Sequence, residues 1–208
     1  MIRYYKTPSF VRWIYPSLVW RKDNSSTIYL TFDDGPHPEV TPWVMAELDK
    51  VGAKATFFCV GKHMQENQQL LLKMHTEGHL IANHTFEHLN GRKVRDQSYL
   101  DSIERCDQVL RSLNMTSTYF RPPYGKIKRS QMNVLRHKDI IMWSHLAYDF
   151  DEGLNVASSL RMLQKAAAGS ILVFHDSRKA FKNLEQLLPK VLSHYKERGF
   201  RMQTLDHD

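Results

Sequence analysis

The sequence contains only two cysteines, Cys59 and Cys106, among its 208 residues. Cys59 lies in an apolar run typical of a strand, Cys106 lies in a run with helical spacing, and no Cys-x-x-C pair is present. This pattern argues against a disulfide framework and against a thiolate zinc site. We expect both residues to be buried structural thiols.

Long apolar runs are also missing, and none approaches the length that crosses a bilayer. The N-terminus does not resemble a secretory signal, because Arg12, Pro16 and Arg21 interrupt its only apolar segment. Unless a leader precedes this sequence, we expect the protein to act in the cytoplasm, where it is synthesised, and to have no transmembrane segment.

Acidic residues are fewer than basic ones, 22 against 29, which gives a formal net charge of +7. The basic residues are scattered, and no nucleic-acid motif accompanies them, so we expect a basic surface and no nucleic-acid partner. Repeats and low-complexity linkers are absent as well. A chain of this length buries one sizeable core, and we predict a monomer with an N-terminal extension (1–26) and one catalytic domain (27–208).

The first 26 residues mix aromatic and basic side chains, among them Trp13, Trp20 and Arg12. Such mixtures occur in segments that lie on membrane surfaces. Pro8 and Pro16 leave little room for a long amphipathic helix, however. We therefore favour a segment that packs across one end of the domain.

From residue 28 onward, strand-like and helical patterns alternate. The strand-like segments are 28–32, 55–60, 79–83, 119–121, 139–143, 170–174 and 201–204. The helical segments are 42–50, 65–77, 98–113, 130–138, 156–168 and 181–197. Four glycines, Gly52, Gly78, Gly169 and Gly199, each follow a helical segment and precede a strand, as C-terminal caps do.

Strands that alternate with helices indicate a parallel sheet in an α/β fold. The length fits a small closed or nearly closed (β/α) barrel better than a full eightfold barrel, which takes about 250 residues. The pattern alone leaves a doubly wound open sheet as the alternative.

The stretch from Ile28 to Pro36 is the centre of the predicted site. Its apolar run ends in two adjacent carboxylates, Asp33 and Asp34, followed by a Gly-Pro turn. Such a pair at the end of a buried strand is costly unless a metal ion or a proton-transfer reaction uses it. Taken alone, the same four residues also make a common solvated turn.

Other strand ends carry polar groups too, which favours a functional reading because a barrel gathers these ends on one face. The segments concerned are 83–88, 120–125, 143–150 and 173–176. His84 and His88 are four residues apart, so one helical turn would place both imidazoles on one side. With a carboxylate they make a three-ligand metal set. Two histidines and a carboxylate also describe non-haem iron oxygenases, but those carry His-x-Asp on an all-β fold.

Three motifs in this order, Thr-Phe-Asp-Asp-Gly-Pro, His-Thr-x-x-His and Arg-Pro-Pro-Tyr-Gly, make the chain resemble the polysaccharide deacetylase family (the NodB homology domain, carbohydrate esterase family 4). The resemblance covers about Thr27 to Thr204. It implies a distorted (β/α)7 barrel, in agreement with the strand pattern.

The resemblance also implies a role for each matched residue. Asp33 would be the catalytic base, held by Arg121, and Asp34, His84 and His88 would bind the metal. His175 would be the catalytic acid, supported by Asp149. The backbone N–H of Tyr124 would face the developing oxyanion, with Pro123 beside it, and Thr85 would shape the loop between the two metal ligands.

Two departures from the family pattern fall in the substrate pocket. Phe150 stands where the fourth motif often has Trp, and Val173 stands where the fifth motif has Leu. Neither change touches the metal ligands, so they bear on substrate identity and leave the reaction type unaffected.

The resulting prediction is a metal-dependent hydrolase that removes N-acetyl or O-acetyl groups from an amino-sugar oligo- or polysaccharide, through a metal-bound water. The expected ion is Zn²⁺, with Co²⁺ or Ni²⁺ as alternatives, and the expected partner is an N-acetylated glycan. One rival is an inactive, metal-containing, carbohydrate-binding barrel, and another is a hydrolase of a different non-peptide amide. The missing leader fits poorly with an extracytoplasmic polymer as substrate.

Overall fold

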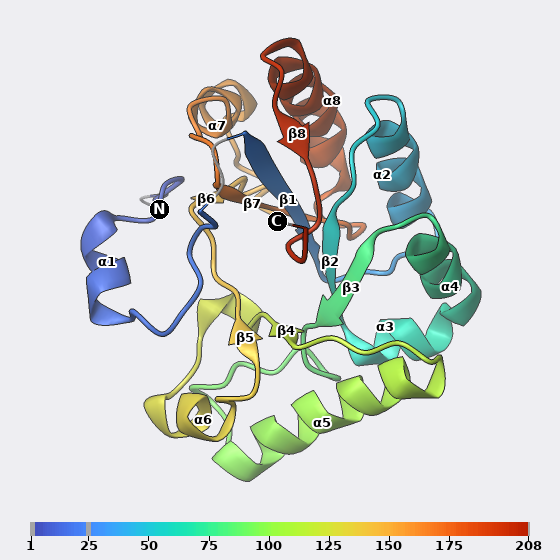
Figure 1. Cartoon of the computed structure of the whole chain (residues 1–208), viewed down its shortest axis with the longest axis vertical. Coiled ribbons are helices and arrows are strands. Elements are labelled where there is room, and N and C mark those ends of the chain that lie inside the picture. The colour runs from blue at the N-terminus through green and yellow to red at the C-terminus, as the bar shows by residue number, and fades with distance from the viewer. Residues whose placement is uncertain (1–2, 24–25, 208) are drawn as a thin grey trace.

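The computed structural model describes residues 3–23 and 26–207, which form one sheet of eight strands with helices packed around it (Figure 1). The strands are β1 (Thr27–Asp33), β2 (Thr56–Cys59), β3 (Leu80–Asn83), β4 (Tyr119–Phe120), β5 (Asp139–Ile140), β6 (His145–Leu146), β7 (Ile171–His175) and β8 (Arg201–Met202). The helices are α1 (Ser9–Ile14), α2 (Val40–Asp49), α3 (Gly61–Glu66), α4 (Gln68–Thr76), α5 (Asp96–Ser112), α6 (Arg129–Val134), α7 (Val156–Leu163) and α8 (Phe181–Glu197), with a 3₁₀ turn, η1 (Pro123–Gly125).

The strand order shows that the sheet curls into a distorted barrel. All of the strand pairs are parallel, and their order is β5-β4-β3-β2-β1-β7-β6. This order runs once around a ring without the reversal of a doubly wound sheet, so that alternative is wrong. The predicted (β/α)7 barrel is confirmed. The short β8 pairs with the first residues of β1.

The N-terminal segment packs along the side of the barrel where β5 and β6 form no ladder with each other within the described residues (Figure 1). Val19 bridges to Ile141 in parallel, and Lys6 bridges to His145 in antiparallel. The backbone N–H of Thr7 donates to the Ser144 carbonyl over 2.9 Å. The segment therefore supplies the backbone partners that the two strands do not give each other.

The alternation of β1 separates the inside of the barrel from the outside. Ile28, Leu30 and Phe32 belong to the large apolar cluster between sheet and helices. Tyr29 belongs instead to a second cluster with Phe58, Ile171 and Leu205, among others. The backbone N–H of Leu205 donates to Thr56 Oγ1 over 3.0 Å, so the C-terminal residues help close the end of the barrel opposite the strands' carboxyl ends.

Several simpler predictions are also confirmed. Cys59 and Cys106 are free and buried. The four capping glycines all have positive φ. At Gly169 a β-carbon would lie 2.0 Å from the Lys22 carbonyl oxygen, so only glycine fits there. In the described parts of the chain, no helix has the length and apolar character needed to span a membrane.

Candidate active site

The carboxyl ends of β1, β3, β4 and β7 converge on one cavity of about 590 Å³. Acidic, histidine and apolar side chains line it, together with Ser177 and Lys179. The lining residues are Asp33, Asp34, Val60, His63, His84, His88, Pro122, Tyr124, Gly125, Trp143, Leu146, Phe150, Val173, His175, Ser177 and Lys179. The predicted convergence of strand ends is present in the structure.

Asp33, at the end of β1, is held by Arg121, which follows β4. Arg121 Nη1 donates to Asp33 Oδ1 over 2.6 Å, and also to Thr31 Oγ1 over 2.8 Å. Arg121 is fully buried. A short hydrogen bond between a buried guanidinium and a carboxylate fixes the orientation of both groups.

The remaining N–H groups of Arg121 fix its position. Its Nε donates to the Ile141 carbonyl over 3.3 Å, and its Nη2 donates to the Met142 carbonyl over 3.1 Å. The guanidinium carbon lies 4.0 Å above the centre of the Phe58 ring. Arg121 thus joins β1, β4 and the residues after β5 inside the barrel.

Asp34, His84 and His88 bring one ligand atom each to within 4.8 Å of one another. His88 Nε2 lies 3.1 Å from Asp34 Oδ1, and His84 Nε2 lies 3.8 Å from the same oxygen. These three residues are the predicted ligand set, and two imidazoles with a carboxylate are a donor set that suits zinc.

Hydrogen bonds prepare the histidine and carboxylate for a metal. His84 Nδ1 lies 2.7 Å from the Arg121 carbonyl, which can only accept, so Nδ1 carries the hydrogen and Nε2 presents a lone pair. Burial lowers the pKa of His84 to about 4, which keeps the ring neutral at neutral pH. Burial opposes ionisation of Asp34, but the hydrogen bond from His88 and the nearby histidines hold its pKa well below the usual range. The residues present therefore fit a divalent cation.

The loop that carries the two histidines is not helical, contrary to the one-turn spacing argument. Thr85 and His88 have φ values of 62° and 56°, in the left-handed region. The Leu89 N–H donates to Thr85 Oγ1 over 3.1 Å, and the Thr85 N–H donates to Asn83 Oδ1 over 2.8 Å. This local bonding, rather than a helical turn, brings the imidazoles together, and it agrees with the loop-shaping role expected of Thr85.

His175, the last residue of β7 and the register partner of Asp33, is bound twice by Asp149. His175 Nδ1 lies 2.7 Å from Asp149 Oδ1, and the His175 backbone N–H donates to Asp149 Oδ2 over 2.8 Å. Asp149 is fully buried. Burial disfavours the charged imidazole, but the charge and hydrogen bond of Asp149, with smaller contributions from Asp34 and Asp33, raise the pKa of His175 to about 9. The ring is therefore a proton donor at neutral pH.

Of the four residues predicted to contact the substrate or the oxyanion, three line the cavity and one does not. Tyr124, Phe150 and Val173 line the cavity, whereas Pro123 is buried in η1 and Pro122 takes the lining position. Tyr124 has a φ of 59°, and its backbone N–H has no hydrogen-bond acceptor among the described residues. The Phe150 ring packs edge-on against His175 with ring centres 4.8 Å apart.

Three site features carry no clear sequence signal. His63 lines the cavity, and its Nδ1 lies 2.7 Å from the Asp34 carbonyl. Trp143 and Leu146 extend the apolar wall. His145 lies at the start of β6 and does not line this cavity.

Asp176 is the third site feature that has no clear sequence signal. Only its position next to His175 in the sequence pointed to a role in the site. It is fully buried and accepts hydrogen bonds from the Gly35 N–H, over 3.1 Å, and from Thr41 Oγ1. A β-carbon on Gly35 would lie 2.0 Å from Asp176 Oδ2, so the Asp-Asp-Gly-Pro turn needs glycine for this contact. Burial raises the pKa of Asp176 to about 7.

A barrel with a buried Asp–Arg pair, a His–Asp pair and a three-residue ligand set around one cavity is typical of a hydrolase. Residues 21–143 match the sequence profile of the polysaccharide deacetylase family. The chain belongs to that family.

Relatives of known activity cover nearly the whole chain. A chitooligosaccharide deacetylase of Azorhizobium caulinodans is 33% identical over 189 residues, which covers 88% of this chain and 84% of the relative. A peptidoglycan-N-acetylglucosamine deacetylase of Bacillus cereus is 30% identical over 186 residues, covering 88% and 68%. A crystal structure of a peptidoglycan N-acetylglucosamine deacetylase in complex with a naphthalenyl-N-oxidanyl-benzamide matches with a TM-score of 0.86 and 28% identity, covering 94% of each chain.

Proposed function

We propose that this protein is a metal-dependent hydrolase that removes N-acetyl groups from an amino-sugar oligo- or polysaccharide. The observation that carries the proposal is the arrangement around one cavity of a paired base (Asp33–Arg121), a paired acid (His175–Asp149) and a three-residue ligand set. The activities of the relatives, on peptidoglycan and on chitooligosaccharide, support the same reaction class.

Asp34, His84 and His88 would hold a single divalent ion, with zinc expected first and cobalt or nickel as alternatives. When bound, such an ion supplies Lewis-acid polarisation and lowers the pKa of water from near 16 toward about 7. His63 helps to hold the backbone of Asp34 in place, because its Nδ1 lies 2.7 Å from the Asp34 carbonyl oxygen.

Asp33 acts as the general base and accepts a proton from the attacking water. Arg121 fixes its position through their 2.6 Å ion pair, while Asp34 is left for the ion. The backbone N–H of Tyr124 is available to the negative charge that develops on the former carbonyl oxygen. One such fixed donor contributes roughly 3–4 kcal/mol to the stability of the transition state.

His175 acts as the general acid and donates a proton to the leaving amine. Its Nδ1 is engaged by Asp149, so Nε2 is the atom that faces the substrate. A pKa of about 9 keeps the ring charged over the neutral range. An amine leaves poorly without this proton, which explains why the chain maintains a buried His–Asp pair here.

The apolar wall indicates how an acetyl group would be held. Leu146 and Val173 are neighbours in the register of β6 and β7, and both line the cavity. They offer a surface for the acetyl methyl group. Phe150 and Trp143 extend this wall, while the exposed Tyr124 borders the opening. Because Phe150 and Val173 are smaller than the residues usual in the family, we expect a wider pocket.

The test is acetate release from a panel of N-acetylated chitooligosaccharides, peptidoglycan fragments and O-acetylated glycans, after loading with zinc or cobalt. We expect release from at least one N-acetylated substrate and loss of release on treatment with a chelator. Tight binding of a glycan without acetate release, in the zinc and cobalt forms alike, would support the inactive binding barrel instead. Release only from a non-glycan amide would support the other rival.

A further inference from the structure

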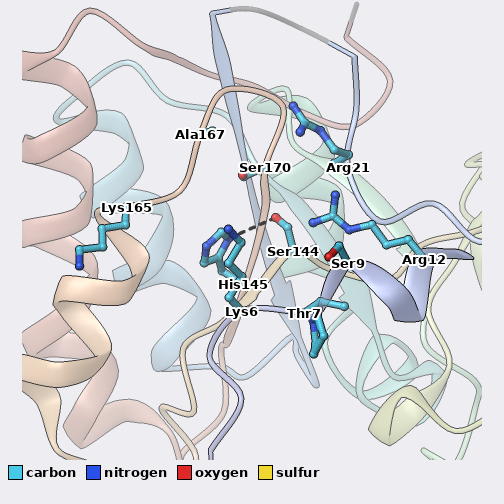
Figure 2. Close-up of a pocket in the computed structure, with 11 residues that line it drawn as sticks. Lys6, Thr7, Ser9, Arg12, Arg21, Ser144, His145, Lys165, Ala167 and Ser170 are labelled. Carbon is cyan, nitrogen blue, oxygen red and sulfur yellow. Dashed lines mark hydrogen bonds between the residues drawn. The ribbon is translucent and has the colours of Figure 1, made fainter.

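A second cavity, of about 420 Å³, lies at the opposite end of the strands from the active site (Figure 2). It is formed by the N-terminal segment, the start of β6 and the loop before β7. Its lining residues are Lys6, Thr7, Pro8, Ser9, Arg12, Arg21, Ser144, His145, Lys165, Ala167 and Ser170. Ser170 and His175 flank β7 at its two ends, so the two cavities are separated by roughly 16 Å.

The charge in this cavity is of one sign. Four of the lining residues are Lys or Arg, and none is Asp or Glu. Figure 2 shows the Arg12 and Arg21 guanidinium groups close together on one side of the space and His145 on the other. Among the described residues, Lys6, Arg12 and Lys165 form no ion pair. These cations are therefore available to bind an anionic ligand.

Arg12 and His145 show that the cavity is prepared for hydrogen bonding. The Nε of Arg12 is buried and has no hydrogen-bond partner, which is costly unless a ligand satisfies it. His145 is only 3% exposed, and burial, with Lys6 and Arg12 nearby, lowers its pKa to about 4. The ring is therefore neutral at neutral pH and is bonded at Nδ1 only by Ser144 Oγ, 3.3 Å away. Ser9 and Thr7 add hydroxyl groups at the rim.

The surface beside the cavity is apolar. Arg12 belongs to α1, and the same short helix exposes Phe10, Trp13 and Ile14, with Trp13 88% exposed. With Tyr4, these residues are four of the six large hydrophobic side chains that are exposed in the described parts of the chain. Isolated exposed apolar residues are common, but a group of them beside a basic cavity is the combination that binds the surface of an anionic bilayer.

We propose that the basic cavity and the exposed face of α1 together form a docking site for a membrane that contains anionic phospholipid. The phosphate of a headgroup enters the cavity and accepts hydrogen bonds from Arg12 and Arg21. Phe10, Trp13 and Ile14 insert at the boundary between headgroups and acyl chains. None of these residues lines the catalytic cavity, so docking leaves that cavity open.

Sedimentation of the full chain with vesicles tests this proposal. Vesicles of phosphatidylglycerol and phosphatidylcholine should bind the protein, added salt should weaken the binding, and vesicles of phosphatidylcholine alone should not bind. Arg12→Gln should weaken binding about fivefold, the effect expected for one basic residue at an anionic surface. Trp13→Ser should weaken it about tenfold, as expected when a large buried apolar side chain is lost.

Arg136→Gln is the matched control, since Arg136 is exposed, lies outside the basic cavity and donates a hydrogen bond to Asn133 Oδ1 over 3.5 Å. Lys6→Gln provides a second charge variant whose exposed side chain is not needed for folding. Thermal unfolding of each variant verifies the fold. Equal binding to both kinds of vesicle, or equal effects of Arg12→Gln and Arg136→Gln, would overturn the proposal.

Inorganic phosphate distinguishes a lipid headgroup from a free anion. Stabilisation of the wild type by phosphate, absent in Arg12→Gln, together with no vesicle binding, would show that the anion is free and would overturn the lipid assignment. Vesicle binding that Trp13→Ser leaves unchanged would overturn the insertion of α1.

Discussion

Asp33 and Asp34 are adjacent in the sequence, yet their surroundings assign them different tasks. Asp33 is buried against Arg121, whereas Asp34 faces the two ligand histidines. The sequence could predict both residues, because two carboxylates at the end of a buried strand are costly unless a metal ion or a proton transfer uses them. Their division of labour, however, depends on Arg121, 88 positions from Asp33, and the resemblance to a family was needed to predict it.

The first prediction concerns Asp33→Asn. The amide keeps the volume and one acceptor for Arg121 but cannot take a proton, so activity should fall by roughly 10²–10⁴-fold. Metal content, measured by elemental analysis, should stay at the wild-type level. Loss of metal in this variant would mean that the two aspartates have exchanged roles, and near-normal turnover would remove Asp33 from the mechanism.

The second prediction concerns the ligand set. His84→Ala and His88→Ala should each lower the bound zinc, because a three-residue set that loses one imidazole keeps only two protein ligands. Elemental analysis after dialysis measures this directly. His75→Ala, a change in an exposed histidine of α4, is the matched control. An equal zinc content in the wild type and in the variant that carries both His84→Ala and His88→Ala would contradict the assignment.

The third prediction is the pH dependence of the proposed acid. Activity should fall at high pH as His175 loses its proton, and this loss forms the basic limb of the pH profile. Asp149 raises the pKa of His175, so Asp149→Asn should move the basic limb to lower pH. The kcat profile from pH 5 to 10 measures the shift. A basic limb that stays in place would exclude His175 as the titrating acid.

A comparison of substrates checks the same role independently. His175→Ala should keep the metal and slow the hydrolysis of an N-acetyl sugar severely. It should spare an acetate ester more, because an alkoxide needs less help from an acid than an amine does. Equal losses on both substrates, with displaced metal, would instead make His175 a structural residue.

At the scale of elements, long periodic patterns in the sequence predicted strands and helices well. Interruptions of a helix and very short strands were not predicted. The predicted strand over 28–32 and the predicted helix over 98–113 agree with β1 and α5 to within two residues at every end. The helix predicted over 65–77 covers α4 but only the last two residues of α3, and the two helices are separated at Asn67, which has φ −131° and whose side chain donates to the His63 carbonyl over 2.9 Å. The short β6 was missed, since its ladder depends on β7 and on the N-terminal segment.

The fourth prediction concerns His79, where β2 and β3 begin. His79 Nδ1 accepts a hydrogen bond from the Ala55 N–H over 3.2 Å, and burial, with a smaller effect of Lys54, lowers its pKa to about 4. The unfolded chain binds a proton near pH 6.5, and the folded chain binds one only near pH 4. Between these values the unfolded state holds more protons than the folded state. The free energy of unfolding therefore falls as the pH falls from 6.5 toward 4.

His79→Asn tests this contribution, because Asn offers an acceptor at a similar position and does not titrate. Unfolding by urea at several values from pH 8 to pH 4 should show a smaller loss of stability in the variant than in the wild type. Parallel curves for the two proteins would show that His79 does not contribute to acid unfolding.

At the scale of the whole molecule, the N-terminal segment is part of the core. Trp20 is buried, packs in one cluster with Tyr99 and Phe120, and donates from Nε1 to the Tyr15 carbonyl over 3.1 Å. Composition predicted that the segment packs on the domain. Its position beside β5 and β6 could not be predicted, because the bridges join residues more than 120 positions apart.

The fifth prediction compares two tryptophans of this segment. Trp20→Ala should lower the free energy of unfolding by about 3–5 kcal/mol, the usual cost of a large cavity. Trp13→Ala, at an exposed position, should change it by no more than about 0.5 kcal/mol. Urea denaturation measures both. Similar small effects would mean that the segment is only an appendage.

The placement of the N-terminal segment beside β5 and β6 also determines when this segment can fold during synthesis. Val19 pairs with Ile141, and Lys6 pairs with His145, so each of these N-terminal residues waits for a partner that is made more than 120 residues later. At about 5–20 residues per second, the delay is roughly 6–24 s. During that interval, Leu18 and Trp20 lack the later residues, such as Ile140 and Met142, that share their apolar cluster in the folded protein. The nascent chain therefore offers chaperones an apolar N-terminal segment until the second half of the barrel emerges.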